Sequence, residues 1–291
     1  MFLQATVSGL ITGSVYALIA LSIVIIFKTS EVPNFGAGEI FMIGAYCGLL
    51  LYGYFRVPYY LVYIIAVMVT FGLGIVFQQL ILAPIVKARP NVASLVIATL
   101  GLAFVLKGGV RLFKASEIFR SFPPIFGTKP MIIGGIVLTK QGLVIFGVAI
   151  VIMVIFFSFF RFAKLGKAMR AVSMNEKAAS LIGINFNLIY AFVWGISAAL
   201  GGAAGILIAP VILIHPDMGI IAIKAFAAAI IGGFTSLPGA IVGGFLIGLA
   251  ENLVGVYIST NMMEVTPFIL IMATLVIRPG GLFTKVIQKK V

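Results

Sequence analysis

Long runs without any charged side chain constrain this chain more than any other feature. Five such runs hold twenty or more residues each: 2–27, 57–86, 141–160, 178–216 and 225–250. An α-helix rises about 1.5 Å per residue, so about twenty residues cross the roughly 30 Å hydrocarbon core of a bilayer. The sequence therefore predicts a protein that crosses a membrane several times.

The composition and the pattern within these runs predict the fold class. Hydrophobic residues make up 62% of the chain and charged residues 9%, against about 25% charged residues in a typical soluble domain. In hydrocarbon each backbone N–H and C=O group needs a partner, which helices and closed barrels provide. The runs lack the alternation of apolar and polar residues that is typical of membrane strands. We therefore predict an all-α, polytopic transmembrane helical bundle, with residues 1–291 forming a single transmembrane domain.

Turn residues and charges divide the chain into nine apolar segments. Their approximate bounds are 3–27, 36–53, 58–86, 92–113, 141–160, 186–210, 219–234, 237–257 and 264–278. The segments 36–53, 219–234 and 264–278 are short for a full span, so we expect about eight membrane-spanning helices with short or broken segments among them. No basic stretch precedes the first segment, which is longer than the core of a signal peptide, and we expect it to remain in the protein.

Several other classes of protein fit the sequence poorly. Cys47 and His215 are the sole cysteine and histidine, which excludes an intramolecular disulfide and a zinc site built from Cys and His. The net charge of +13 could indicate nucleic-acid binding, but the basic residues are scattered at segment ends. Contact with membrane lipid headgroups explains them better, so we predict no nucleic-acid partner, no metal and no catalytic residues.

The distribution of lysine and arginine predicts the orientation. The strongest basic cluster lies between the fifth and sixth segments and consists of Arg161, Lys164, Lys167, Arg170 and Lys177. Short cytoplasmic loops are enriched in Lys and Arg, so we place this cluster in the cytoplasm, with Lys87, Arg89 and the C-terminal lysines on the same side. The loop of about residues 114–140 then faces outward, and its prolines Pro123, Pro124 and Pro130 indicate that no helix passes through it.

Two places interrupt the apolar pattern with glycine, proline and polar residues. A pair of broken helices, one in each half, is typical of transporters built from two related halves, because a broken helix frees backbone groups to line a solute path. Small residues also let helices pack closely without any role in transport, and that alternative stays open for each glycine. The residues that we consider for the translocation path are Asn34, Phe35, Gly38 and Glu39 at the first break, and Gly232, Gly233, Thr235 and Ser236 at the second.

Glu39 and Glu251 lie inside or at the margin of apolar segments. A carboxylate there is unfavourable unless it faces a partner or a watery cavity, so each is a functional candidate as well as a structural one. Glu251 could instead pair with a basic residue or simply be protonated. His215 and Asp217 follow Pro210 and are most simply residues of an external loop, with a role in contacting the solute as the alternative.

The stretch 164–185 differs from the rest of the chain. Apolar residues recur in it near helical spacing among lysines and arginines, which predicts a pair of amphipathic surface helices. Such helices either rest on anionic lipid headgroups or dock a cytoplasmic partner.

A family resemblance favours docking. The stretch 175–185, with Glu176, Ala178, Ala179 and Gly183 in the pattern E-x-A-A-x-x-x-G, resembles the cytoplasmic EAA-type loop of ABC importer permeases. Together with 33–46 (PNFGAGEIFMIGAY), 224–240 (KAFAAAIIGGFTSLPGA) and 278–282 (RPGGL), the chain resembles the permease family of the high-affinity branched-chain amino acid importers. Lys177 departs from the strict motif because it separates Glu176 from the two alanines.

The resemblance implies a multi-pass permease of a cell inner membrane. Its partners would be a second permease subunit, by resemblance a related chain, two cytoplasmic ATPase subunits and an external solute-binding protein. The four EAA-type residues would couple this chain to the ATPase. No G-x-x-x-x-G-K-[ST] phosphate loop occurs in the sequence, so ATP would act through partner subunits and this chain would bind no cofactor. The alternative is an ion- or proton-coupled secondary carrier that uses Glu39 and Glu251. Which amino acid or related solute is carried does not follow from the sequence.

Overall fold

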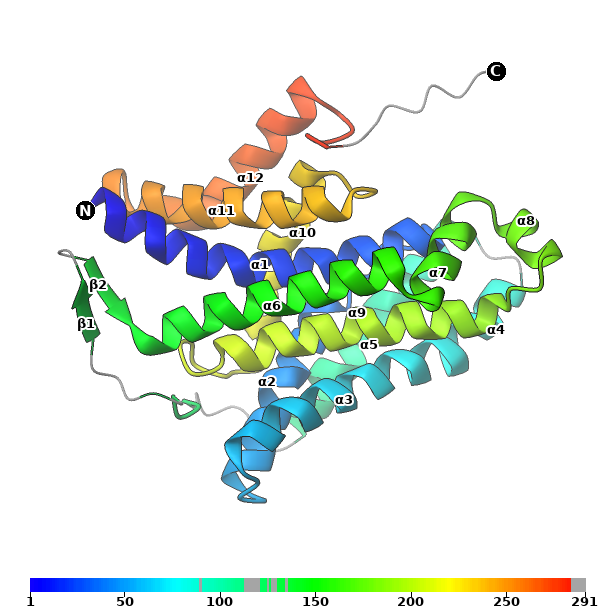
Figure 1. Ribbon diagram of the computed structural model, residues 1–291, viewed down its shortest axis with the longest axis horizontal. Helices are drawn as coiled ribbons and strands as arrows, with labels where there is room; N and C mark the ends of the chain where they lie inside the picture. Colours follow the sequence, from blue (N-terminus) through cyan, green and yellow to red (C-terminus); the bar gives the residue numbers. More distant parts are fainter. Residues whose placement is uncertain (89–90, 113–120, 125, 127–129, 134–135, 284–291) are drawn as a thin grey trace.

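The protein, as seen in a computed structural model, is a bundle of helices with one small hairpin (Figure 1). The structure describes residues 1–88, 91–112, 121–124, 126, 130–133 and 136–283. The first helices are α1 (Phe2–Ser30), α2 (Ala37–Gly53), α3 (Tyr59–Phe77), the π-helical turn η1 (Gln78–Leu82), α4 (Ala83–Lys87) and α5 (Val92–Arg111). The strands β1 (Pro130–Ile133) and β2 (Ile136–Thr139) follow. The remaining elements are α6 (Lys140–Phe162), α7 (Lys164–Met174), α8 (Glu176–Leu181), α9 (Phe186–Ile208), the 3-10 turn η3 (Met218–Ile220), α10 (Ile221–Gly232), α11 (Leu237–Tyr257) and α12 (Thr260–Ile277).

The predicted all-α membrane bundle is confirmed. Within the described ranges, seven helices are long and apolar enough to cross a membrane, with α3, η1 and α4 forming one continuous span. Two shorter apolar helices, Ala37–Gly53 and Met218–Gly232, complete the set. Each of the nine apolar segments predicted from the sequence corresponds to one of these helices, because the length of an uninterrupted apolar run limits where a membrane helix can begin and end.

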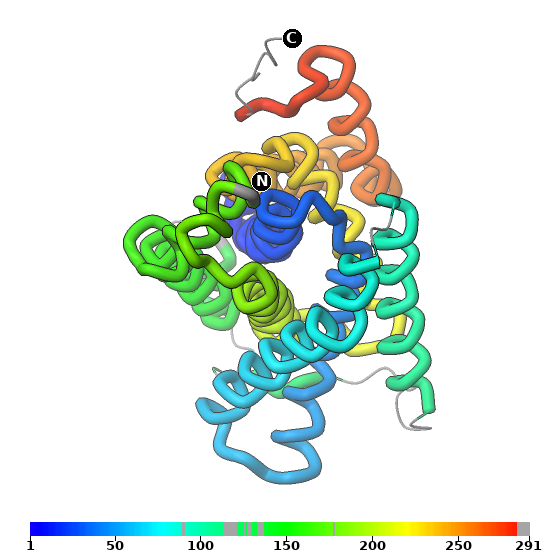
Figure 2. Tube along the Cα trace, turned by 90° about the vertical axis from the view of Figure 1, so that its right-hand side faces the viewer, coloured from blue at the N-terminus to red at the C-terminus, as the bar shows by residue number. Residues whose placement is uncertain are grey.

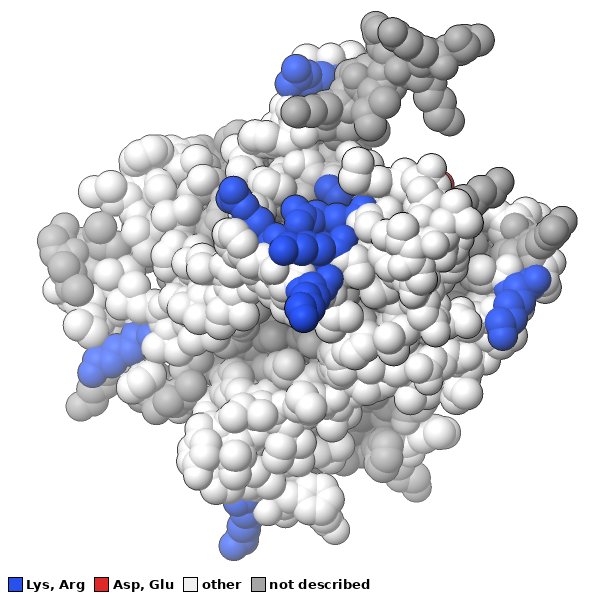
Figure 3. All heavy atoms as spheres, turned by 45° about the vertical axis from the view of Figure 1, so that its right-hand side comes forward, with Lys and Arg blue, Asp and Glu red and all other residues white. Residues whose placement is uncertain are grey.

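The two ends of the bundle differ in chemistry. The hairpin and the N-terminus lie at one end, whereas α4, α7 and α8 lie at the other, which we call the α7–α8 end (Figure 1). Lys and Arg side chains gather on the face that is turned forward in Figure 3. Arg161, Lys164 and Lys167 are exposed, and Arg170 donates a hydrogen bond of 3.0 Å to the Arg161 carbonyl oxygen. The strands β1 and β2, which belong to the predicted external loop, therefore lie at the end opposite to α7, which carries Lys164, Lys167 and Arg170.

The hairpin was not anticipated from the sequence. β1 and β2 pair antiparallel, with Pro130 opposite Thr139. The Gln4 side chain both donates to the Val137 carbonyl oxygen and accepts from the Val137 N–H, each at 2.8 Å, so the start of α1 is bound to β2. Some predictions concern residues outside those that the structure describes. These residues are Arg89, most of the loop before the hairpin and the C-terminal lysines.

The core is built on α1 and α9. In their most apolar windows, 78% of the α1 residues and 83% of the α9 residues are buried by other parts of the protein, against 11% for both α5 and α12. Close packing depends on small residues: a Cβ added to Gly244 in α11 would collide with the backbone of Ala17 in α1. The outer helices are left to face lipid or another subunit.

The contacts between helices occur twice, once for each half of the chain, if α1, α2, α3 and α5 are matched with α9, α10, α11 and α12. The contact of α1 with α11 then corresponds to that of α9 with α3, and the contact of α2 with α9 corresponds to that of α10 with α1. α2 also contacts α5 as α10 contacts α12. Since α1 and α9 run in opposite directions along the bundle (Figure 1), the set α1–α5 and the set α9–α12 form an inverted pair, which supports the prediction of two related halves.

The repeat changes the interpretation of the two breaks. The short helix α2 follows the break at 31–36, and its counterpart α10 follows the segment 209–217 and not the glycine-rich stretch at 232–244. In that stretch only 233–236 is non-helical, because Gly243 and Gly244 lie inside α11, where they let neighbouring backbones approach. The first predicted break therefore has a counterpart in the other half, but the counterpart is the segment 209–217 and not the predicted second break.

Candidate functional site

A cavity of about 790 Å³ lies where the two short helices begin. Its walls come from the start of α2, from α5, from η3 and α10, and from α12. Figure 2 views the bundle from the α7–α8 end and places α5 and α12 on the same side of it. Most of the lining is apolar, including Leu100, Phe104, Ile223, Phe226 and Ile271. This volume lies in the range of about 300–1,000 Å³ that is typical of small-molecule sites.

Two helix starts meet at the cavity because glycine occupies the crossing point. A Cβ added to Gly38, in the first turn of α2, would collide with the carbonyl oxygen of Gly219 in η3. The Asn34 side chain, which is completely buried, accepts a hydrogen bond of 3.0 Å from the Gly36 N–H and so fixes the turn into α2. Phe35 turns toward α10, where its ring stacks on that of Phe226 at 5.3 Å between centroids.

Glu39 lines the cavity from the first turn of α2. A carboxylate at this position is favoured by the partial positive charge at a helix N-terminus. The sequence singled out Phe35, Gly38 and Glu39 as residues of a solute path, and the structure brings all three to the cavity wall. Asn34 does not line the cavity, and its buried side chain instead fixes the turn that leads into α2.

Charged residues from two other elements complete the site. Lys107 on α5 and Asp217 in the segment before η3 line the cavity and form an ion pair of 2.5 Å. Arg111 contacts both carboxylate oxygens of Asp217 at 3.1 Å. The hydrogen bond from Lys107 and the nearby positive charges hold the pKa of Asp217 below its usual value, and 54% of the Asp217 side chain is exposed.

Lys107 was not predicted to be a site residue. The available signal was a lysine inside the apolar segment 92–113, since an ionisable residue within a membrane span is a functional candidate by default. Phe226 gave no signal of its own, because a phenylalanine in an apolar helix is common on every face.

The residues of the second predicted break form a tight turn between α10 and α11. Gly233 has φ 98°, which glycine adopts readily, and Ser236 caps α11 by accepting a hydrogen bond of 3.1 Å from the Gly239 N–H. The Thr235 carbonyl oxygen accepts a bond of 2.8 Å from Lys28, and Gly232 packs against Gly239. None of these four residues lines the cavity, whereas Phe234, which lies between Gly233 and Thr235 in the sequence, lines it.

The predicted pair of surface helices is present as α7 and α8. Asn175 caps α8 by accepting a hydrogen bond of 3.0 Å from the Ala178 N–H. After α8 the chain turns at Gly183, whose φ of 81° lies in the left-handed region. Glu176 and Ala178 are exposed, whereas Ala179 is buried, so α8 packs on the bundle through Ala179 and presents Glu176 and Ala178 outward.

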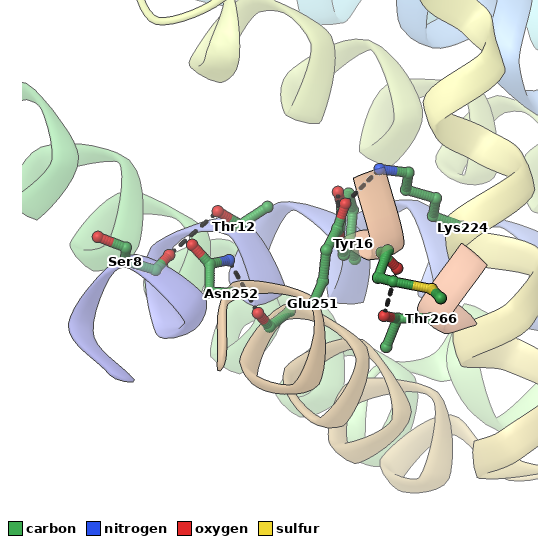
Figure 4. Close-up of polar contacts among 9 residues, drawn as sticks. Ser8, Thr12, Tyr16, Lys224, Glu251, Asn252 and Thr266 are labelled. Atoms are coloured by element: carbon green, nitrogen blue, oxygen red, sulfur yellow. Dashed lines mark hydrogen bonds and ion pairs between the residues drawn. The ribbon is translucent and has the colours of Figure 1, made fainter. Parts of the chain in front are cut away.

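Glu251 lies away from the cavity, in a buried polar network (Figure 4). Its carboxylate forms an ion pair with Lys224 of α10 and accepts a hydrogen bond of 2.8 Å from the Tyr16 hydroxyl of α1. Thr12 and Thr266 lie nearby and bond to backbone carbonyl groups of their own helices. Of the two explanations left open for Glu251, the structure supports pairing with a basic residue.

Comparison with known proteins places this arrangement in a family. A family model described as "Branched-chain amino acid transport system / permease component" matches residues 5–275. The chain belongs to this permease family. The permease is 30% identical over 305 residues to the high-affinity branched-chain amino acid transport system permease protein LivH of Salmonella typhimurium, covering 100% of this chain and 98% of LivH.

A second relative supports this result. The permease is 31% identical over 306 residues to the high-affinity branched-chain amino acid transport system permease protein BraD of Pseudomonas aeruginosa, with the same coverage of 100% and 98%. A structure described as PsaBC from Streptococcus pneumoniae in complex with Fab aligns with a TM-score of 0.48 and 14% identity, over 94% of this chain and 91% of that chain, which is too remote to bear on function. The predicted family resemblance is confirmed, and the permease is a multi-pass membrane transport protein.

Proposed function

We propose that this chain is a permease subunit of an ATP-driven ABC importer that carries branched-chain or related amino acids across the inner membrane. The relatives LivH and BraD are permease proteins of branched-chain amino acid transport systems. The observation that carries the proposal is the α7–α8 segment, which stands at the basic end of the bundle and presents an exposed, capped helix that ends at a left-handed glycine.

The chemistry of α8 suits docking to a partner. Leu181 is 88% exposed and Ile182 is 74% exposed, although both are apolar. Exposed apolar side chains next to Glu176 and Ala178 form a small surface that an ATPase subunit could cover. Since Gly183 fixes the direction of the chain after α8, a push on α8 is transmitted to α9 at the centre of the bundle.

The remaining parts of the importer follow from this proposal. ATP would be bound by two separate ATPase subunits, this chain would bind no cofactor, and an external binding protein would deliver the solute at the hairpin end. A second permease subunit, a related chain, would cover the outer helices. The solute would pass by the cavity at Glu39, and hydrolysis would alternate the bundle between outward and inward openings.

The test is reconstitution of the complete importer in proteoliposomes, with leucine uptake and ATP hydrolysis measured together. Gly183→Pro replaces a left-handed residue with one restricted to φ near −65°, so it should abolish ATP hydrolysis that depends on the binding protein. Glu176→Lys reverses the charge on the same face and should have a similar effect. Glu264→Lys, at an exposed position near the start of α12, is the matched control. Normal stimulation in both α8 variants would refute this placement of the coupling segment.

The alternative carrier mechanism makes an opposite prediction. An ion- or proton-coupled carrier would take up solute down an ion gradient when this chain is reconstituted without any ATPase. Glu251 is already paired with Lys224 and Tyr16, which leaves it poorly suited to bind and release a proton in each cycle. Gradient-driven uptake by the chain alone would overturn the importer proposal.

A further inference from the structure

The charges that line the cavity are unevenly paired. Asp217 is held by Lys107 at 2.5 Å and by Arg111 at 3.1 Å. Among the residues that the structure describes, no salt bridge within 4.0 Å joins the Glu39 carboxylate to a basic side chain. Lys107 attracts Glu39 only from a greater distance. The cavity therefore contains one carboxylate that a small cation could neutralise.

The rest of the cavity is apolar and aromatic. The stacked rings of Phe35 and Phe226 form one wall, and Ile223 and Leu100 form others. A carboxylate without an ion pair in such surroundings favours a cationic partner, because an uncompensated charge near low-dielectric walls is unfavourable. The apolar walls would bind a ligand whose remaining surface is hydrocarbon.

Building on the proposed function, we infer that this cavity holds an aliphatic α-amino acid as its zwitterion, with the ligand ammonium on Glu39. The ligand carboxylate is directed toward Lys107, whose ammonium group has three N–H donors and uses one on Asp217. The aliphatic side chain lies against Phe226 and Ile223. Glu39 is thus the residue that selects for an α-ammonium group.

A binding experiment separates the two ends of the ligand. The melting temperature of the purified full-length chain is measured with leucine, with isopentylamine, which lacks the carboxylate, and with 4-methylpentanoate, which lacks the ammonium. A ligand that binds only the folded state raises the melting temperature. We expect the largest shift with leucine, a smaller one with isopentylamine and the smallest with 4-methylpentanoate.

Substitution of Glu39 then identifies the group that reads the ammonium. Glu39→Gln should remove most of the shift caused by leucine and by isopentylamine, leave that of 4-methylpentanoate unchanged, and be partly corrected in Glu39→Asp. Glu264→Gln, an exposed carboxylate outside the cavity, should behave as the wild type. No shift with leucine in the wild type, equal shifts with all three compounds, or a normal leucine shift in Glu39→Gln would each overturn the inference. A sodium-dependent shift without leucine that Glu39→Gln abolishes would overturn it too, because the site would then bind an inorganic ion.

A transport experiment keeps this inference distinct from the proposed function. In the complete importer, Glu39→Gln should lower leucine uptake at least about tenfold, because the amide keeps an acceptor oxygen but loses the charge that strengthens the hydrogen bond to the ammonium. If the wild-type importer takes up no leucine, the proposed function fails. If the wild type transports leucine and Glu39→Gln transports it equally well, only the role of Glu39 fails.

Discussion

Glu251 and Asp217 each form an ion pair with a lysine and contact one further donor, but in opposite surroundings. The Glu251 side chain is 5% exposed and that of Lys224 is 22% exposed, whereas Asp217 is 54% exposed and Lys107 is 32% exposed. Buried charges have lost their contact with water and depend on each other, whereas exposed ones keep water as an alternative partner. The same kind of ion pair, a carboxylate with a lysine, is therefore structural in one place and exchangeable in the other.

This difference fits the positions of the two pairs. The pair of Glu251 with Lys224 joins α11 to α10, and Tyr16 adds α1, so one network holds three packed helices together (Figure 4). The pair of Asp217 with Lys107 joins the start of η3 to α5 at the cavity wall. A charged group that must exchange partners when a solute passes is better placed in the exposed pair of Asp217 with Lys107, because water can replace the lost partner there.

Loss of one partner in the buried pair should have the largest effect. Lys224→Met leaves Glu251 as an uncompensated buried charge, so we expect the free energy of unfolding in detergent micelles to fall by about 3–5 kcal/mol. The control is Lys140→Met at an exposed position on α6. The double variant Lys224→Met with Glu251→Met should recover most of the loss, because neither charge remains. Equal values for Lys224→Met and the control would contradict the buried pair.

Removal of the Tyr16 hydroxyl should lower the free energy of unfolding by less than the loss of Lys224. Tyr16→Phe deletes only the hydroxyl that donates to Glu251 at 2.8 Å, while the ring and the ion pair remain. Hydrogen bonds to charged groups contribute about 1.5–3 kcal/mol, so we expect the free energy of unfolding to fall by that amount. Tyr257→Phe, at an exposed position at the end of α11, is the matched control. A change no greater than that of the control would show that Tyr16 adds nothing to the pair.

The exposed pair should be nearly neutral for stability. Asp217→Asn removes the charge that Lys107 and Arg111 contact, and exposed ion pairs contribute up to about 1 kcal/mol. We expect a decrease below about 1 kcal/mol in the same unfolding assay, and a smaller one in concentrated salt because the charges are screened. A loss as large as that of Lys224→Met would remove the distinction between the two regions.

Acid should weaken the exposed pair only at low pH. Because the pKa of Asp217 is lower in the folded protein than its ordinary value of 3.8, its contribution to stability is complete above that value. The contribution is lost as the pH falls through the lower, folded pKa. Unfolding measured at falling pH should therefore show the wild type and Asp217→Asn converging below about pH 4. A difference between them that grew with acidity would contradict the direction of the shift.

The sequence predicted the elements of the fold well and their relations poorly. Each of the nine apolar segments became a helix near its predicted bounds, because hydrocarbon thickness sets the length of a spanning run. The partner of Glu251 could not be predicted, because Lys224 lies 27 residues away on another helix. The break at 32–39 was visible in the sequence, but its counterpart at 209–217 was not, since only the helix packing relates the two segments.

The candidate site was predicted in part for the same reason. Phe35, Gly38 and Glu39 stood out because they interrupt an apolar pattern locally. Lys107 and Phe226 join them only because α5 and α10 fold against the start of α2. The sequence alone determined that the chain crosses a membrane as helices and where each helix lies, since these depend on local hydrophobicity. Only the tertiary structure decided that Glu251 is paired and that Glu39 faces a cavity, because pairing depends on contacts between residues far apart in the chain.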